Sequence, residues 1–130
     1  MPISPENAVA AQVVDAAYRI HTTLGPGLLE SVYELLLAYE LEKRRLHFVR
    51  QFPVPISYHG VRIPTGFRAD LIVSDLAIVE IKAVEALAPV HRKQLLTYLR
   101  LSGKRLGVLI NFNVPLIKDG ISRVANQMPD

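Results

Sequence analysis

The hydrophobic pattern of this 130-residue chain changes its period near residue 46. Before that point, apolar residues recur every three or four positions, which predicts helices over residues 5–24 and 28–45. Ser4 is a typical N-cap for the first helix, and a Gly-Pro-Gly segment at residues 25–27 separates the two helices. The second helix is expected to bury a face formed by Leu29, Val32, Leu36 and Tyr39.

Beyond residue 46 the pattern is typical of strands, because β-branched and aromatic residues cluster between turn residues. Strands are predicted over residues 47–58, 61–63, 67–73, 76–84 and 105–112. A third helix is predicted over residues 89–102, and the C-terminal residues are expected to form a short tail with a turn. The order α-α-β-β-β-β-α-β predicts an α/β (α+β) fold, a mixed sheet covered by helices, in one domain over residues 1–130.

The composition excludes several kinds of site. The chain contains no cysteine, so disulfides, cysteine-based zinc sites, iron–sulfur clusters and thiol catalysis are excluded. Its 15 Lys and Arg exceed its 12 Asp and Glu by three, a modest excess that favours polyanionic partners. No stretch approaches the ~18 consecutive apolar residues of a membrane span, and the N-terminus lacks the pattern of a signal peptide. We therefore expect a cytoplasmic protein without a membrane partner.

Charged residues interrupt two of the apolar strands. Glu80 and Lys82 alternate with Val79 and Ile81, so the two charged side chains share one face of their strand. Asp70 lies in the preceding strand, among equally apolar neighbours. Burying an ion costs several kcal/mol unless it is paired or binds a metal, so these positions need an explanation.

The register of the hairpin decides whether Asp70 and Glu80 meet. If Val73 pairs with Leu76, Asp70 opposes Val79, and the two carboxylates lie on opposite faces of the sheet. If Val73 pairs with Ala77, the turn has an odd length and Asp70 opposes Glu80. Two carboxylates at that spacing repel each other, and a shared divalent cation removes the repulsion.

Structural interpretations remain open for each of these residues. Lys82 can pair with either carboxylate on a solvated sheet face, as in many antiparallel sheets. Gln94 and Tyr98 are four residues apart and share a helix face, which is typical of an amphipathic boundary. Glu30 lies in the first turn of the second helix, where an acidic residue interacts favourably with the helix dipole.

Taken together, Asp70, Glu80-x-Lys82 and Gln94-x-x-x-Tyr98 resemble the PD-(D/E)XK nuclease superfamily, and the Gln-x-x-x-Tyr element is similar to that of its RecB-like branch. The sequence Gly-Leu-Leu-Glu-Ser-Val-Tyr at residues 27–33 is similar to the signature of the GxxExxY protein family. This resemblance extends over about residues 10–123 and implies a restriction-endonuclease-like core with a mixed sheet flanked by helices.

The resemblance also implies a metal site. Asp70 and Glu80 would hold Mg²⁺, with Mn²⁺ as a substitute, and the backbone carbonyl of Ile81 would be a further ligand. Glu30 matches a helical acidic residue that completes such sites through water. His21 lies where RecB-like enzymes sometimes place a metal-ligating histidine, although a satisfied polar residue at a helix end is the alternative. Hard Mg²⁺ prefers carboxylate and carbonyl oxygens and keeps several waters, so few protein ligands suffice.

The remaining motif residues would serve catalysis. Lys82 would position or help deprotonate the attacking water and stabilise charge on the phosphate. Gln94 would orient Lys82 or the nucleophile, and Tyr98 would contact the phosphate or support Gln94. The implied activity is that of a metal-dependent endo- or exodeoxyribonuclease.

The implied partner is DNA, single-stranded or structured, bound by the chain alone or as a homodimer. The expected phosphate contacts are basic residues, provided that they cluster on the active face: Arg68, Arg92 and Lys93 above all, with Arg44, Arg45, Arg62 and Arg105 as further candidates. The alternative function is that of a catalytically silent module with the nuclease fold, acting in nucleic-acid binding or protein assembly.

Overall fold

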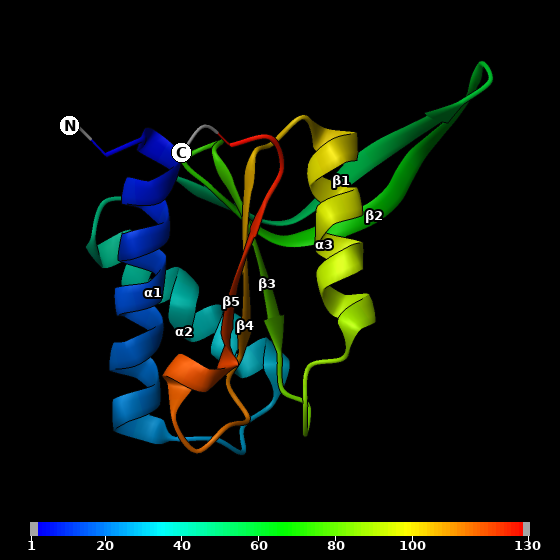
Figure 1. Cartoon of the computed structure of the whole chain (residues 1–130). Helices are drawn as coiled ribbons and strands as arrows, with labels where there is room; N and C mark the ends of the chain where they lie inside the picture. Colours follow the sequence, from blue (N-terminus) through cyan, green and yellow to red (C-terminus); the bar gives the residue numbers. More distant parts are fainter. Residues whose placement is uncertain (1–2, 129–130) are drawn as a thin grey trace.

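The computed structural model describes residues 3–128 and consists of a five-stranded sheet between helices. The elements follow in the order α1 (Pro5–Leu24), α2 (Glu30–Lys43), β1 (Phe48–Tyr58), β2 (Val61–Val73), β3 (Ala77–Lys82), α3 (Pro89–Ser102), β4 (Leu106–Asn111), a 3₁₀ helix (Ile117–Gly120) and β5 (Ile121–Ala125). Helices α1 and α2 cover one face of the sheet and α3 covers the other (Figure 1).

The sheet is mixed, as the sequence predicts. Its strands lie in the order β1-β2-β3-β4-β5. Within residues 3–128 only β3 and β4 run parallel, and α3 provides the crossover between them. The other three neighbouring pairs are antiparallel. The predicted α/β class with a helix-covered mixed sheet is therefore confirmed.

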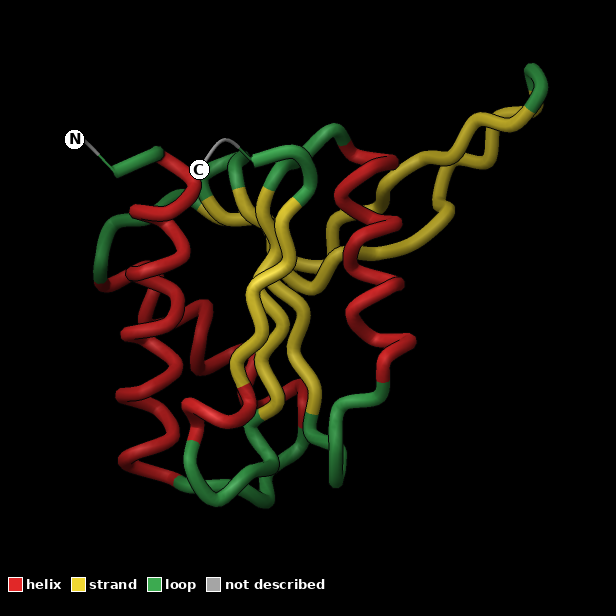
Figure 2. The backbone as a smooth tube through the Cα atoms, viewed as in Figure 1, coloured by secondary structure: helices red, strands yellow, loops and turns green. Residues whose placement is uncertain are grey.

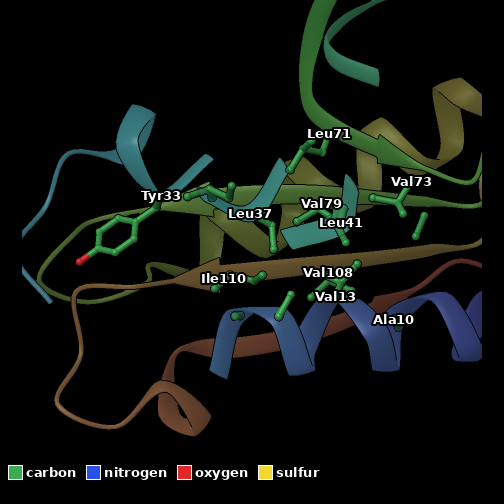
Figure 3. Packing of buried hydrophobic residues seen from close by; sticks show 14 of the residues in the cluster. Ala10, Val13, Tyr33, Leu37, Leu41, Leu71, Val73, Val79, Val108 and Ile110 are labelled. Carbon is green, nitrogen blue, oxygen red and sulfur yellow. The ribbon is translucent and has the colours of Figure 1, made fainter. Parts of the chain in front are cut away.

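The larger hydrophobic core lies between the sheet and the first two helices. Figure 3 shows Val13 of α1 and Leu37 and Leu41 of α2 packed toward Val79 and Val108 of the central strands. Helix α1 begins as predicted, because the Ser4 hydroxyl accepts the Asn7 N–H over 3.1 Å. The smaller core lies under α3 on the opposite face of the sheet.

The predicted buried face of α2 is wrong. The residues that face the sheet are Tyr33, Glu34, Leu37, Ala38 and Leu41. Leu29 and Tyr39 of the predicted face are instead 72% and 60% exposed. Apolar side chains surround this helix on nearly all sides, so their spacing alone does not identify the buried face.

The predicted element order requires two corrections. The strands predicted over residues 61–63 and 67–73 form one continuous strand, β2, whose pairing with β1 shifts register between Val54 and Ile56. Proline is compatible with a bulge, so Pro64 does not end the strand. The predicted C-terminal tail contains the 3₁₀ helix and β5, which pairs with β4.

The distal part of the β1–β2 hairpin projects from the body as a two-stranded ribbon (Figure 2). We call residues 52–69 the arm. Strand β2 pairs with β3 only from Leu71 to Val73, so within the arm it has β1 as its only partner strand. The base of the arm rests on α3, where the rings of Phe67 and Tyr98 stack with centroids 3.8 Å apart.

Within residues 3–128, no helix combines the length and apolar character needed to cross a membrane.

Candidate metal-binding and catalytic site

The β2–β3 turn has the odd length on which the metal-site hypothesis depends. Val73 pairs with Ala77, leaving three turn residues, of which Ser74 and Asp75 have φ angles of 53° and 56°. These left-handed conformations are uncommon for residues other than glycine, but Asp is among the residues that tolerate them. Continued one residue beyond the pair of Leu71 and Val79, this register places Asp70 opposite Glu80.

At the two acidic residues, side chains replace the backbone hydrogen bonds of the ladder. The Asp70 N–H donates to Glu80 Oε2 over 2.8 Å, and the Ile81 N–H donates to Asp70 Oδ2 over 2.8 Å. Backbone pairing between β2 and β3 extends only as far as Leu71 and Val79. One oxygen of each carboxylate is therefore fixed by backbone, and within residues 3–128 Glu80 Oε1 has no hydrogen-bond partner.

The surroundings of the two carboxyl groups disfavour their charged forms. Burial, together with the nearby Asp70 carboxylate, raises the pKa of Glu80 from 4.5 to about 8. Burial also raises the pKa of Asp70, to which the charge of Glu34 contributes. Lys82 acts in the opposite direction on both groups but does not outweigh burial. Without further positive charge, the pair retains a proton at neutral pH.

Glu34 is a third acidic residue near the pair, and the sequence analysis missed it. It is 6% exposed on α2, where its Oε2 accepts two hydrogen bonds from Arg50 at 2.8 and 3.1 Å. Gln51 Nε2 donates to Glu34 Oε1 over 2.7 Å and, over 3.4 Å, to Asp70 Oδ1. Gln51 lies at the position of β1 opposite Asp70 and has a φ of 50°. A polar chain thus connects α2 with the acidic pair.

The helical spacing of α2 also allows a second buried face, and that face contains Glu34. Its spacing to Leu37, Ala38 and Leu41 is three, four and seven residues, which places all four side chains on one helix face. A carboxylate on a buried face needs a partner or a ligand. The partner, Arg50, is provided by the strand that follows the helix.

Lys82 and the Ile81 carbonyl both border the acidic pair. The half-buried Lys82 shares the strand face of Glu80, and its charge lowers the pKa of Asp70 and Glu80. The N–H and C=O of one strand residue point toward the same neighbouring strand. Because the Ile81 N–H meets Asp70 Oδ2, its carbonyl faces the same gap between β2 and β3.

Tyr98 borders the pair from α3, and Gln94 lies one helical turn before it. Burial raises the pKa of the half-buried Tyr98, and the nearby carboxylates of Glu80 and Asp70 add to this effect. Gln94 is exposed on the same helix face, and its side chain makes no hydrogen bond within residues 3–128. The structure therefore brings Tyr98 to the acidic pair and leaves Gln94 at its solvent side.

Two of the predicted metal ligands have different surroundings. Glu30 is exposed at the start of α2, one turn before Glu34. His21 is buried, and its Nε2 lies 2.8 Å from the Val114 carbonyl oxygen, which can only accept a hydrogen bond. The described residues contain no hydrogen bond from either side chain to Asp70 or Glu80.

The basic candidates divide into paired and unpaired residues. Arg44 pairs with Asp15 at 2.7 Å, and Arg105 pairs with Glu6 at 3.0 Å. Arg68 and Lys93 are exposed and form no ion pair within residues 3–128. Arg92 is also exposed, and it donates to the Arg123 carbonyl over 3.3 Å.

The donor set fits a hard divalent cation that keeps part of its water shell. Along residues 3–128, no group of three or more His, Cys, Asp or Glu side chains is arranged to hold a metal by itself. Mg²⁺ commonly binds through only one or two carboxylates and retains several waters. Asp70 and Glu80 supply two carboxylates, and a bound cation would stabilise their charged forms. The Ile81 carbonyl adds an oxygen at the same gap between β2 and β3.

Comparison with known proteins identifies the family. The profile of the PD-(D/E)XK nuclease superfamily matches residues 7–124, which is most of the chain. No curated protein and no solved structure gives a significant match. The α+β arrangement of the described residues is consistent with the restriction-endonuclease-like fold. The narrower resemblance to the GxxExxY family stays a prediction. The chain belongs to the PD-(D/E)XK nuclease superfamily.

Proposed function

We propose that this chain is a Mg²⁺-dependent nuclease that hydrolyses phosphodiester bonds of DNA by attack of water. The observation that carries the proposal is the opposed pair of Asp70 and Glu80, with Lys82 on the same strand face as Glu80. Membership of the nuclease superfamily supports the same conclusion.

Asp70, Glu80 and the Ile81 carbonyl would hold the cation. Each carboxylate keeps a second oxygen beyond the one that a backbone N–H fixes, so binding needs little rearrangement. A divalent cation bound there supplies a Lewis acid for the phosphate and lowers the pKa of a coordinated water.

Lys82 would orient the attacking water and stabilise the negative charge that builds on the phosphate. A lysine ammonium is a compact charge with three donors, suited to one phosphate oxygen and one water. The new bond joins the water oxygen to phosphorus, and the bond from phosphorus to the leaving oxygen breaks. Tyr98 would contact the phosphate from α3, and Gln94 would orient Lys82 or the water from the solvent side.

Glu34 would act on the site through its neighbours. Its carboxylate holds Gln51 against Asp70, and its charge adds to the negative potential at the pair. Both effects favour a bound cation. Glu30, one turn earlier, and His21 remain proposed as more distant contributors through water.

The experiment is a cleavage assay with end-labelled single-stranded, duplex and flap DNA, in Mg²⁺, in Mn²⁺ and in EDTA. We expect cleavage by the wild type with either cation and none in EDTA. Glu80→Gln and Lys82→Ala should each reduce the rate at least ~10²-fold. The matched controls are Glu40→Gln and Lys43→Gln, which remove the same charges from an exposed ion pair between two residues of the α2 surface.

Cleavage that is unchanged in both site variants rejects the mechanism. A wild type that binds DNA with steep salt dependence but never cleaves it supports the catalytically silent module instead. The proposed homodimer is tested on the same preparation by light scattering after size exclusion.

A further inference from the structure

The charges of the molecule are segregated between its two sides. Residues 51–69 and residues 86–118 contain no Asp or Glu, and these stretches include the arm and α3. Six exposed cations lie on them and form no ion pair within residues 3–128: Arg62, Arg68, Arg92, Lys93, Arg100 and Lys118.

The cations of the first two helices are neutralised instead. Arg19, Lys43 and Arg44 each lie within 4 Å of Glu40, and Arg44 also pairs with Asp15 at 2.7 Å. Among the described residues, five exposed cations without an ion pair lie on the arm and α3, and three lie elsewhere: Arg45, Lys118 and Arg123. This distribution matches a polyanion that contacts one side of the protein.

The arm has the shape of an element that enters a groove. It is a two-stranded ribbon, and no further strand or helix of the described residues covers its distal half (Figure 1). Its tip exposes 67% of Tyr58 and 58% of Val61, and the Tyr58 ring packs edge-on against His59. Exposing aromatic and β-branched side chains to water at the end of a ribbon is unfavourable. They gain contact area when the ribbon is inserted into a partner.

The base of the arm is held against the acidic site. Phe67 stacks on Tyr98, which itself borders Glu80 and Asp70. Gly66 lies close to Ile56 of β1, because a Cβ at this position would come within 2.0 Å of the Ile56 side chain. Arg68 is two residues from Asp70 along β2, so a phosphate contact at Arg68 fixes a nucleic acid beside the acidic pair.

We propose that the arm binds in the groove of a DNA duplex, with Arg62 and Arg68 on its phosphates. This inference rests on the proposed function, because it takes DNA as the partner, and it adds the duplex form and the element that recognises it. The major groove of B-DNA, ~12 Å wide, admits a two-stranded β-ribbon. The arm would thereby provide the duplex contacts that a separate DNA-binding domain provides in other proteins.

The test measures binding in EDTA, where cleavage plays no part. A fluorescein-labelled 25-base-pair duplex and one of its single strands are titrated with the full chain, and anisotropy is recorded at several salt concentrations. Arg62→Gln/Arg68→Gln is compared with Arg19→Gln/Lys43→Gln, which removes the same net charge from the opposite side. A third variant, Tyr58→Ser, alters only the tip.

We expect the arm variant to weaken duplex binding at least ~tenfold and to lower the slope of log Kd against log salt by about 2, one unit for each phosphate contact. Tyr58→Ser should weaken duplex binding several-fold with an unchanged slope. The control should stay within twofold of the wild type, and the duplex should bind more tightly than the single strand.

An equal loss of duplex affinity in the arm variant and the control overturns the proposal. The absence of duplex binding by the wild type also overturns it. A dimer that becomes a monomer in the arm variant assigns the arm to a second copy of the chain and overturns it too. Duplex binding that depends on the arm, together with no cleavage in Mg²⁺, keeps this inference and rejects the nuclease activity alone.

Discussion

Asp70 and Glu80 are bound to each other's strands: the Asp70 N–H donates to Glu80 Oε2, and Asp70 Oδ2 accepts the N–H of Ile81, both over 2.8 Å. The two carboxylates thus take the places that backbone carbonyls occupy in an ordinary antiparallel ladder. Burial and the nearby Asp70 carboxylate make a negative charge on Glu80 unfavourable, and a bound cation would offset that cost. This arrangement leads to three predictions, which concern the pH dependence of stability, the effect of Glu34 and the role of Tyr98.

The first is the pH dependence of stability in the metal-free protein. Burial and Asp70 raise the pKa of Glu80 to about 8 in the folded state, against 4.5 ordinarily. The folded state therefore binds this proton more tightly than the unfolded state. The stabilisation is complete below pH 4.5 and is lost as the pH rises to 8, by at most ~1.4 kcal/mol per pH unit.

Urea unfolding in EDTA between pH 5 and pH 9 measures this loss. Glu80→Gln keeps the shape of the protonated side chain and removes its titration, so the variant should lack that part of the slope. The relevant quantity is the difference between wild type and variant, because other groups titrate in both. Parallel curves for the two proteins would show that Glu80 has an ordinary pKa.

The second feature is the influence of Glu34 on the acidic pair. The charge of Glu34 contributes to the raised pKa of Asp70 and of Glu80. Glu34→Gln should therefore move the Glu80 transition in the stability curve to lower pH. It should also cost about 1–3 kcal/mol, because Arg50 loses a charged hydrogen-bond partner.

Glu40→Gln is the matched control for this prediction. Glu40 also accepts from basic side chains on α2, but on the outer surface. Its loss should leave the Glu80 transition in place and cost less than about 1 kcal/mol. If the Glu80 transition in the stability curve of Glu34→Gln were unchanged, Glu34 would have no electrostatic influence on the acidic pair.

The third feature is the double role of Tyr98. Its ring stacks on Phe67 with an interplanar angle of 6°, so Tyr98→Phe should keep the stability within about 0.5 kcal/mol. Tyr98→Leu should lose the stacking, worth about 0.5–1.5 kcal/mol beyond the buried area. If the hydroxyl contacts the phosphate, Tyr98→Phe should cleave DNA at least ~tenfold more slowly. Full activity of Tyr98→Phe would limit Tyr98 to a structural role.

Much of the fold could be predicted from local chemistry. Ser4 and Pro5 mark the start of α1, and Pro89 and Gly103 mark the limits of α3, because these residues act within one helical turn. The hairpin register was reduced to two alternatives by the alternation of side chains. The choice between them required the φ angles of Ser74 and Asp75, which the sequence does not determine.

The errors arose where tertiary contacts decide the outcome. Residues 61–73 form one strand despite Pro64, because β1 provides a partner along the whole length and the bulge absorbs the proline. β5 exists because the edge of β4 is available for pairing. Glu34 was missed because the other face of α2 was predicted to be buried, and its partners, Arg50 and Gln51, lie 16 and 17 residues away in the sequence.

The most direct test of the account is a titration of the protein with Mn²⁺ at pH 8, with the free ion followed by electron paramagnetic resonance. The account predicts saturable binding by the wild type and by Glu40→Gln. It predicts at least ~tenfold weaker binding by Asp70→Asn and by Glu80→Gln, because each loses one of the two carboxylates. Equal binding by all four proteins, or no binding by the wild type, would contradict a metal site at Asp70 and Glu80.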